Sequence, residues 1–345
     1  MYKKYRTSLN KDQSGFAAFA ITMIMMIVLS LIVLGFAASA RNEQRRALDN
    51  QLSMAAYYAS ESGINDAYAV IKSDLANGTS LPAQNTCTGA YNTTSNVLES
   101  NAGVAYTCLL VNPTPPSLEY APISTGHGQV VPVFGSKNET ITSIKISWQQ
   151  DGLTAAANFS GCPGSTINSF YPEASWPTNC SAGVLQVDIV PASGWISEST
   201  LQTVTQTVFL EPVNGASNSS NVVNGNIDGV KCSAPPSGGE YDCSETLTGL
   251  GQAGYYLRFI PIYKNADVSI TAYNSSRTQL NLKNAQVLID STGKASDELR
   301  RVQERVSINP LGNNDVPINA LQAKDGICKM FTVRPSQVSV LTSCP

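Results

Sequence analysis

An uninterrupted run of residues without a charged side chain, residues 16–40, constrains this chain more than any other feature. At about 1.5 Å per residue, a helix of that length measures about 37 Å, which exceeds the ~30 Å hydrocarbon core of a bilayer. A helix in the core of a water-soluble domain would carry a polar face, and this run has none. The sequence therefore predicts a helix that spans a membrane.

A cleaved secretory signal is the alternative interpretation of the same run. Ala38-Ser39-Ala40 offers the small-x-small pattern of a signal peptidase site. The helical pattern continues directly past Ala40, however, and this continuation favours a helix that is retained.

The orientation of the chain follows from its cysteines more than from its flanking charges. Four basic residues precede the apolar run and three follow it closely, a small excess that favours a cytoplasmic N-terminus. All eight cysteines lie after residue 40. Because disulfides persist outside the cytosol, we expect a single-pass protein of the cytoplasmic membrane with its head outside.

Beyond the apolar run, residues 41–76 have the pattern of an amphipathic helix. Apolar side chains recur at steps of three and four residues, at Leu48, Leu52, Ala55, Ala59, Ala67, Ile71 and Leu75. Ala55, Ala59 and Gly63 are small enough to let another backbone approach closely. We expect one helix from Phe16 to about residue 76, ended by Asn77-Gly78.

The junction before the apolar run carries a family resemblance. A short basic leader that ends in Gly15 and is followed by Phe16 resembles the class III signal of type IV pilins and pseudopilins. In that family a membrane peptidase cuts after the glycine and methylates the new N-terminus, which implies a cut between Gly15 and Phe16. Residues 56–67, AYYASESGINDA, are similar to the stretch that follows the anchor in PilX-like minor pilins. Residues 289–302 are similar to a hairpin near the C-terminus of those proteins.

One position departs from the family pattern. Most major pilins carry glutamate at the fifth mature position, where this chain has Ala20. That glutamate is thought to pair with the N-terminal amine of a neighbouring subunit, and a buried amine without a partner is costly. The departure favours a minor pilin or a pseudopilin with a priming, tip or low-abundance role.

The remaining residues, 77–345, predict a β-rich head, which makes the fold class α+β with a mostly antiparallel sheet stapled by disulfides. Strands are expected where apolar and polar residues alternate, at residues 144–148, 185–189, 204–210, 256–262, 268–273 and 285–290. The resemblance adds a strand at 299–308. Loops are expected at residues 77–86, 111–120, 212–229 and 233–239. An inserted subdomain around residues 110–250 would explain the large size of the head.

Eight cysteines allow 105 pairings, so the sequence leaves the disulfide map open. Pairing of neighbours is the simplest arrangement, and it gives Cys87–Cys108, Cys162–Cys180, Cys232–Cys243 and Cys328–Cys344. The last pair would clamp a C-terminal loop, as in many pilins.

No motif in the sequence predicts an enzyme, a cofactor or a metal site. His127 is the single histidine and stands between two glycines, the pattern of a surface loop. There is no Cys-x-x-Cys pair for zinc. Residues 224–229, NGNIDG, begin like a calcium loop, but Pro235 stands where the closing acid belongs, so we expect a turn there.

The charge balance argues against binding of nucleic acid. Without the leader, 18 basic residues face 24 acidic ones. Such a chain has no general positive field that would attract phosphates.

Together the resemblance implies a minor pilin or pilin-like subunit of a type IV filament. Its partners would be the membrane, other pilins, the prepilin peptidase and the pilus assembly platform, and its head would serve contacts such as cell adhesion. A membrane-anchored extracellular binding or adhesion protein without a filament role, and a secretion-system pseudopilin, remain as alternatives.

Overall fold

The computed structural model describes residues 14–91, 97–99, 103–152, 157–163, 172–192, 198–214, 226–233 and 241–308. One long helix, α1 (Ser14–Ala76), opens the chain. The strands that follow are β1 (Val97–Glu99), β2 (Val104–Asn112), β3 (Leu118–Ile123), β4 (Gln129–Gly135), β5 (Ile141–Gln150), β6 (Val184–Pro191), β7 (Gln206–Val213), β8 (Asn226–Lys231), β9 (Cys243–Gln252), β10 (Gly254–Ile262), β11 (Ala266–Tyr273), β12 (Leu282–Lys283), β13 (Gln286–Ala295) and β14 (Glu298–Ser307). A 3₁₀ turn, η1 (Glu173–Ser175), and a short helix, α2 (Glu198–Val204), lie between strands.

Within the described residues the strands form three sheets. Their orders are β1-β2-β13-β14, β12-β4-β10-β6-β7-β8 and β3-β11-β5-β9. Every strand pair within the six-stranded sheet and the sheet β3-β11-β5-β9 is antiparallel, as is β1 with β2, except that β7 and β8 pair in parallel. The chain is thus an α+β protein with one long apolar helix ahead of largely antiparallel sheets.

Packing divides the chain into two compact units. The smaller unit takes the described residues within Met1–Ala67, Thr86–Leu109 and Asp290–Val302. The larger unit takes those within Tyr68–Asn85, Leu110–Ile289 and Gln303–Pro345. The central stretch of the larger unit therefore extends past the subdomain expected at 110–250. The boundary between the two units also does not coincide with the head boundary expected at residue 77. Residues Asp290–Val302, from β13 and β14, belong to the same unit as the helix up to Ala67.

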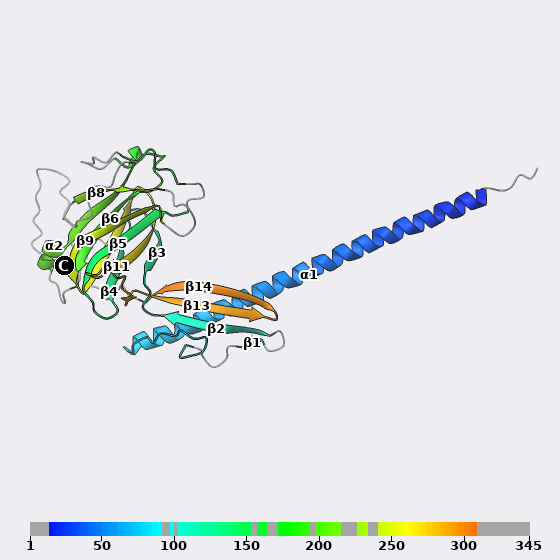
Figure 1. Cartoon of the computed structure of the whole chain (residues 1–345), viewed down its shortest axis with the longest axis horizontal. Helices are drawn as coiled ribbons and strands as arrows, with labels where there is room; N and C mark the ends of the chain where they lie inside the picture. Colours follow the sequence, from blue (N-terminus) through cyan, green and yellow to red (C-terminus); the bar gives the residue numbers. More distant parts are fainter. Residues whose placement is uncertain are drawn as a thin grey trace, which may run out of the picture. The chain divides into compact units, whose positions relative to one another are not determined.

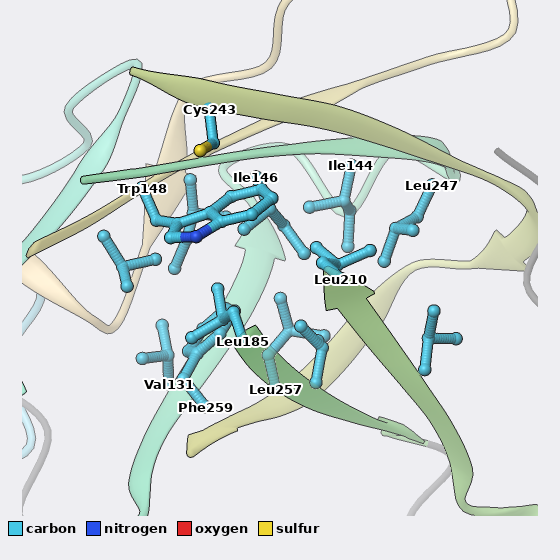
Figure 2. Packing of buried hydrophobic residues seen from close by; sticks show 14 of the residues in the cluster. Val131, Ile144, Ile146, Trp148, Leu185, Leu210, Cys243, Leu247, Leu257 and Phe259 are labelled. Carbon is cyan, nitrogen blue, oxygen red and sulfur yellow. The ribbon is translucent and has the colours of Figure 1, made fainter. Parts of the chain in front are cut away.

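The larger unit is a β-sandwich with one hydrophobic core. Alternate residues of the six-stranded and the four-stranded sheet point into the space between them, as Figure 2 shows for Ile144, Ile146, Leu185 and Leu257. Trp148 is fully buried in this core, and its indole N–H donates a hydrogen bond to the Gly183 carbonyl oxygen at 3.1 Å. Burial of this apolar surface is the main stabilising contribution to the unit.

The smaller unit packs the second half of α1 against a sheet (Figure 1). Ala56 and Ala59 of α1 are fully buried against Val104 of β2 and Ala295 of β13. β2 and β13 are neighbours in this sheet although β3 to β12 separate them in the sequence.

Most of the expected strands are present, and one of them is shifted. Residues 144–148, 185–189, 256–262 and 268–273 lie within β5, β6, β10 and β11, and residues 286–290 begin β13. Residues 299–307 of the strand expected at 299–308 lie in β14. The expected strand at 204–210 begins two residues later, because α2 continues through Val204.

Two expected loops contain strands instead. β3 begins at Leu118, inside the proline-rich segment 111–120, because Leu118 and Ile123 are buried in the sandwich core. β8 replaces the end of the loop at 212–229 and the turn expected at 224–229. There Val230 is buried in the core and β8 pairs with β7, so tertiary pairing overrides the polar local composition. Of the expected loop 233–239, residues 234–239 lie outside the described residues.

Candidate assembly helix

The first part of α1 presents an apolar surface without cover from the rest of the described chain. Gly15 and Phe16 lie in its first turn, and the segment from residue 18 onward is long and apolar enough to cross a membrane. In its most hydrophobic stretch of 18 residues, no residue is buried. Large side chains exposed here include Phe19, Ile21, Met23, Ile24, Met25, Met26, Ile27, Val28, Leu29, Leu31, Ile32, Val33, Leu34 and Phe36.

The hydroxyl groups of this segment are compatible with a hydrocarbon environment. Thr22 donates a hydrogen bond to the Phe19 carbonyl oxygen at 2.9 Å, and Ser30 donates to the Met26 carbonyl oxygen at 2.7 Å. Polar groups in lipid must be satisfied within the protein, and both hydroxyls meet this demand inside the helix. Position 20 holds alanine in this segment, so it places no carboxylate there.

The positions expected to form the assembly surface divide into exposed and buried ones. Leu48 is exposed, and Leu52 and Ala55 are half-buried. Ala59 and Gly63 are buried within the smaller unit, so the backbone that approaches these small residues belongs to the chain's own strands.

Two glycines allow the helix and the sheet to meet this closely. A Cβ at Gly293 of β13 would overlap the backbone of Ala56 and Ser60. A Cβ at Gly63 of α1 would overlap the Ser291 hydroxyl and lie 3.0 Å from the Tyr106 ring. These glycines are therefore required by a close approach of chain segments, and neither has a left-handed φ.

Polar contacts fix the register between the helix and its sheet. The Tyr106 hydroxyl donates to an Asp66 carboxylate oxygen at 2.8 Å, and Arg300 Nε donates to the Ser53 hydroxyl at 2.8 Å. A disulfide joins Cys87 to Cys108 of β2 in the same unit. The second half of α1 is thus held by its own sheet at several points along its length.

The face of α1 that points away from the sheet carries aromatic residues that the sequence analysis did not single out. Tyr57 and Tyr58 are exposed and form an edge-to-face pair with ring centroids 5.8 Å apart. Met54 is exposed one turn before them. Tyr57 and Tyr58 do not share the three- and four-residue spacing of Ala55, Ala59 and Gly63. This difference in spacing is the feature of the sequence that could have predicted their exposure.

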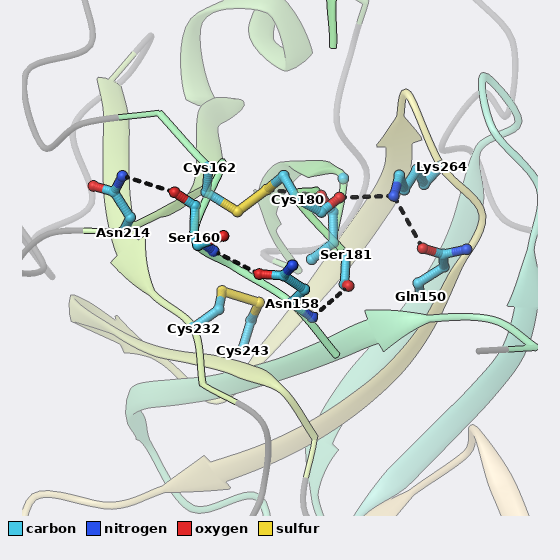
Figure 3. Close-up of a disulfide and its surroundings, with 12 residues drawn as sticks. Gln150, Asn158, Ser160, Cys162, Cys180, Ser181, Asn214, Cys232, Cys243 and Lys264 are labelled. Atoms are coloured by element: carbon cyan, nitrogen blue, oxygen red, sulfur yellow. Dashed lines mark hydrogen bonds between the residues drawn. A yellow bond between two sulfur atoms is a disulfide. The ribbon is translucent and has the colours of Figure 1, made fainter. Parts of the chain in front are cut away.

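Disulfides hold the loops of the larger unit. Cys162–Cys180 and Cys232–Cys243 are bonded there (Figure 3). With Cys87–Cys108, three of the neighbour pairings considered from the sequence are present. Cys328 and Cys344 lie outside the described residues. The Lys264 ammonium donates to the Cys180 carbonyl oxygen at 2.7 Å, and its burial lowers the pKa of Lys264.

A buried ion pair lies on the six-stranded sheet. The Asp188 carboxylate is 2% exposed, and it accepts hydrogen bonds from Arg258 Nε at 2.6 Å and from the Thr207 hydroxyl at 2.7 Å. Gln186 Nε2 donates to the same carboxylate at 3.0 Å. Arg258 of β10 and Thr207 of β7 lie on the two neighbouring strands and Gln186 lies on β6 itself, so all three partners belong to the sheet, which suits a structural role.

Glu211 of β7 is the other buried acid of interest. Its side chain is fully buried, and neither carboxylate oxygen has a hydrogen-bond partner among the described residues. Burial raises the pKa of Glu211 to about 7. In the described part of the chain, no three His, Cys, Asp or Glu side chains group as a metal site. His127 is exposed in the loop between β3 and β4, and one of its ring nitrogens lies 3.1 Å from the Thr125 carbonyl oxygen.

Comparisons with known proteins add no relative: no protein-family model, no curated protein and no solved structure matches the chain. A function for the chain is therefore inferred from the residues and the geometry of α1.

Proposed function

We propose that this chain is a subunit of a type IV filament, similar to the PilX-like minor pilins, and that it is processed between Gly15 and Phe16. The observation that carries the proposal is the division of α1 into two parts. Its first part is apolar and exposed, and its second part is packed beneath the chain's own sheet.

That division suits a protein that is first held in lipid and later held by other helices. In the membrane, lipid covers the apolar segment at residues 18–36. In a filament, the helices of neighbouring subunits replace the lipid, and the apolar surface remains out of water in both states. The packed second half keeps the head attached to the helix during the transfer.

Processing can be tested in cells that contain a prepilin peptidase. The full chain is expressed, purified from membranes, and its N-terminus is determined by mass spectrometry. We expect a methylated Phe16. A start at Met1 would indicate an ordinary membrane anchor, and a start near Arg41 would indicate a secretory signal; either result would overturn the proposal.

Two glycine variants make the test specific. Gly15→Ala should block processing, because the peptidase cuts after glycine in the family that the leader resembles. Gly35→Ala is the matched control, since a Cβ at Gly35 meets nothing within 4 Å and lies far from the junction. Equal processing of both variants and the parent chain would contradict the proposed cleavage.

The same experiment extends to assembly. Filaments sheared from the cell surface should contain the processed chain, whereas a secretion-system pseudopilin would remain in the cell envelope fraction. Processed chain that is absent from both kinds of assembly would contradict the filament role while leaving the cleavage intact.

A further inference from the structure

Three arginines stand in the first two turns of α1 after its apolar segment, in residues 41–46, here called the arginine segment. Arg41, Arg45 and Arg46 are exposed, and none of them forms an ion pair with another of the described residues. Glu43 is the single acid in the segment, and it lies two positions from both Arg41 and Arg45, so it points to another side of the helix. The arginine segment thus presents an excess of positive charge.

The sheet of the smaller unit leaves the arginine segment uncovered. Arg45 lies on the same stripe of α1 as Leu52 and Ala56, which follow at helical spacing. Residues 41–51 are nevertheless all exposed, and Leu52 is the first residue beyond the apolar segment that packs against the sheet. About 18 Å of helix therefore separates Ala40 from the first contact with the sheet.

The length of the arginine segment matches a layer of lipid headgroups. At about 1.5 Å per residue it extends about 9 Å from the end of the apolar segment at Ala40. Each headgroup layer of a bilayer is about 5–8 Å thick, so insertion of the apolar segment brings the three guanidinium groups to the level of the phosphates. Asp49, the next acid along the helix, lies about 13 Å beyond Ala40 and therefore outside this layer.

The spread of the arginines around the helix suits a surface better than a single ion. At about 100° per residue, Arg41, Arg45 and Arg46 cover about 140° of the circumference. Guanidinium groups bind phosphate oxygens through paired N–H donors, and a layer of phosphates can meet all three groups at once.

We propose that Arg41, Arg45 and Arg46 bind the phosphate groups of anionic phospholipids in the leaflet from which α1 leaves the bilayer. The occupant is the lipid surface, in preference to free phosphate or an acidic face of a second copy of the chain. The inference rests on insertion of the apolar segment into a membrane, and it is independent of cleavage at Gly15 and of a filament role.

Spin-labelled lipids test the proposal in bilayers that contain the full chain. The chain is reconstituted in phosphatidylcholine vesicles, and electron paramagnetic resonance gives the fraction of spin-labelled phosphatidylglycerol or phosphatidylcholine that is held at the protein. We expect phosphatidylglycerol to associate about fivefold more strongly. Resistance to extraction by carbonate verifies insertion. Equal association of the two lipids with an inserted chain would overturn this inference alone, whereas a chain that does not insert would also overturn the proposed function.

A triple variant assigns the preference to the arginines. Replacing Arg41, Arg45 and Arg46 together by glutamine should lower the association of phosphatidylglycerol about fivefold, while the basic leader is the same in both chains. Replacing all three by lysine keeps the charge and should retain most of the preference. An unchanged preference in the glutamine variant would refute the assignment.

A second variant controls for net charge. Lys137→Gln combined with Arg277→Gln removes two exposed charges from the larger unit, and it should leave the association of phosphatidylglycerol unchanged. A loss equal to that in the triple glutamine variant would show a general charge effect and would contradict binding at the arginine segment.

Two further conditions separate the lipid surface from the other occupants. Inorganic phosphate added at constant ionic strength should leave the lipid preference unchanged, and displacement of the lipid would show a site for free phosphate instead. The preference should also be the same at all ratios of protein to lipid. A preference that appears only when the chain is diluted in lipid would show that second copies cover the arginines.

Discussion

Gly293 of β13 lies against Ala56 of α1 so closely that a Cβ on the glycine would overlap the Ala56 carbonyl oxygen. The opposing atoms belong to helix backbone, which cannot move aside as the end of a flexible side chain could. The contact between the helix and its sheet therefore depends on the absence of one side chain.

Gly293→Ala should lower the free energy of unfolding of the smaller unit by about 1–3 kcal/mol, the usual cost of overpacking. Gly251→Ala is the control, because a Cβ at Gly251 meets nothing within 4 Å. Hydrogen exchange measured at α1 residues 52–63 should quicken in the first variant only. Unchanged exchange in Gly293→Ala would show that the sheet can move away from the helix at little cost.

Glu211 should make stability depend on pH. Its folded pKa of about 7 lies above the usual value of 4.5, so the folded chain holds this proton more tightly than the unfolded chain. The contribution of Glu211 is most favourable below pH 4.5 and is lost as pH rises toward 7, by about 3 kcal/mol in total. Glu211→Gln should therefore stabilise the chain by about 2–3 kcal/mol at pH 8 and have little effect at pH 4.

Urea denaturation at both pH values measures this difference. Glu173→Gln serves as the control, because Glu173 is exposed on η1 of the same unit. If Glu211→Gln has the same effect at pH 4 and pH 8, the carboxylate is not a source of pH dependence.

Arg258 should contribute more to the free energy of unfolding than its partial exposure suggests. Arg258→Met leaves the buried Asp188 carboxylate without its cation, a change that typically costs about 3–5 kcal/mol. Asp188→Asn in the same chain should recover part of that loss, because the neutral amide needs no counter-charge. Arg277→Met, at an exposed position of the same unit, should change the urea midpoint little. Additive effects of the Arg258 and Asp188 changes would refute the coupling.

Ala20 offers a test of the missing carboxylate under the proposed filament role. Ala20→Glu should increase incorporation into filaments, because it supplies a charged partner for the N-terminal amine of a neighbouring subunit. Ala20→Gln has a similar shape without the charge and should leave incorporation at the parental level. Quantitative immunoblotting of sheared filaments gives the readout, and equal incorporation of both variants would contradict this account of position 20.

Local rules located the long helix well. Its C-terminal end falls at Ala76, where Gly78 adopts a left-handed φ of 66° and Asn77 donates its backbone N–H to the Ser73 carbonyl oxygen. Such an end is encoded by adjacent residues, so the sequence alone was sufficient to predict it.

β4 shows why the sequence pattern did not predict some of the strands. It contains Pro132 and ends at Gly135, and both residues weaken a strand pattern in the sequence. The sheet tolerates Pro132 because β12 pairs with β4 only at Phe134 and Gly135, leaving Pro132 paired on its other side with Tyr256. That arrangement depends on strands more than a hundred residues away, which no local pattern contains.

In the candidate assembly helix, too, some features follow from adjacent residues and others from distant strands. The apolar segment and its small residues were visible in the sequence, because their spacing is helical. Which of these residues remain exposed was not visible, because Gly293 and Tyr106 cover Ala59 and Gly63 from strands distant in the sequence. Burial of this kind is set by tertiary packing.

The adjacency of β2 and β13 has a consequence for the order in which the protein forms. During synthesis β2 leaves the ribosome long before β13, and the sheet on α1 cannot close until β13 and β14 arrive. The segment Leu110–Ile289 is complete by then and supplies the core of the sandwich. Ala56 and Ala59 of the helix therefore lack their contacts with Gly293 and Ala295 until β13 has been made, and during this delay a chaperone or the membrane surface can cover them.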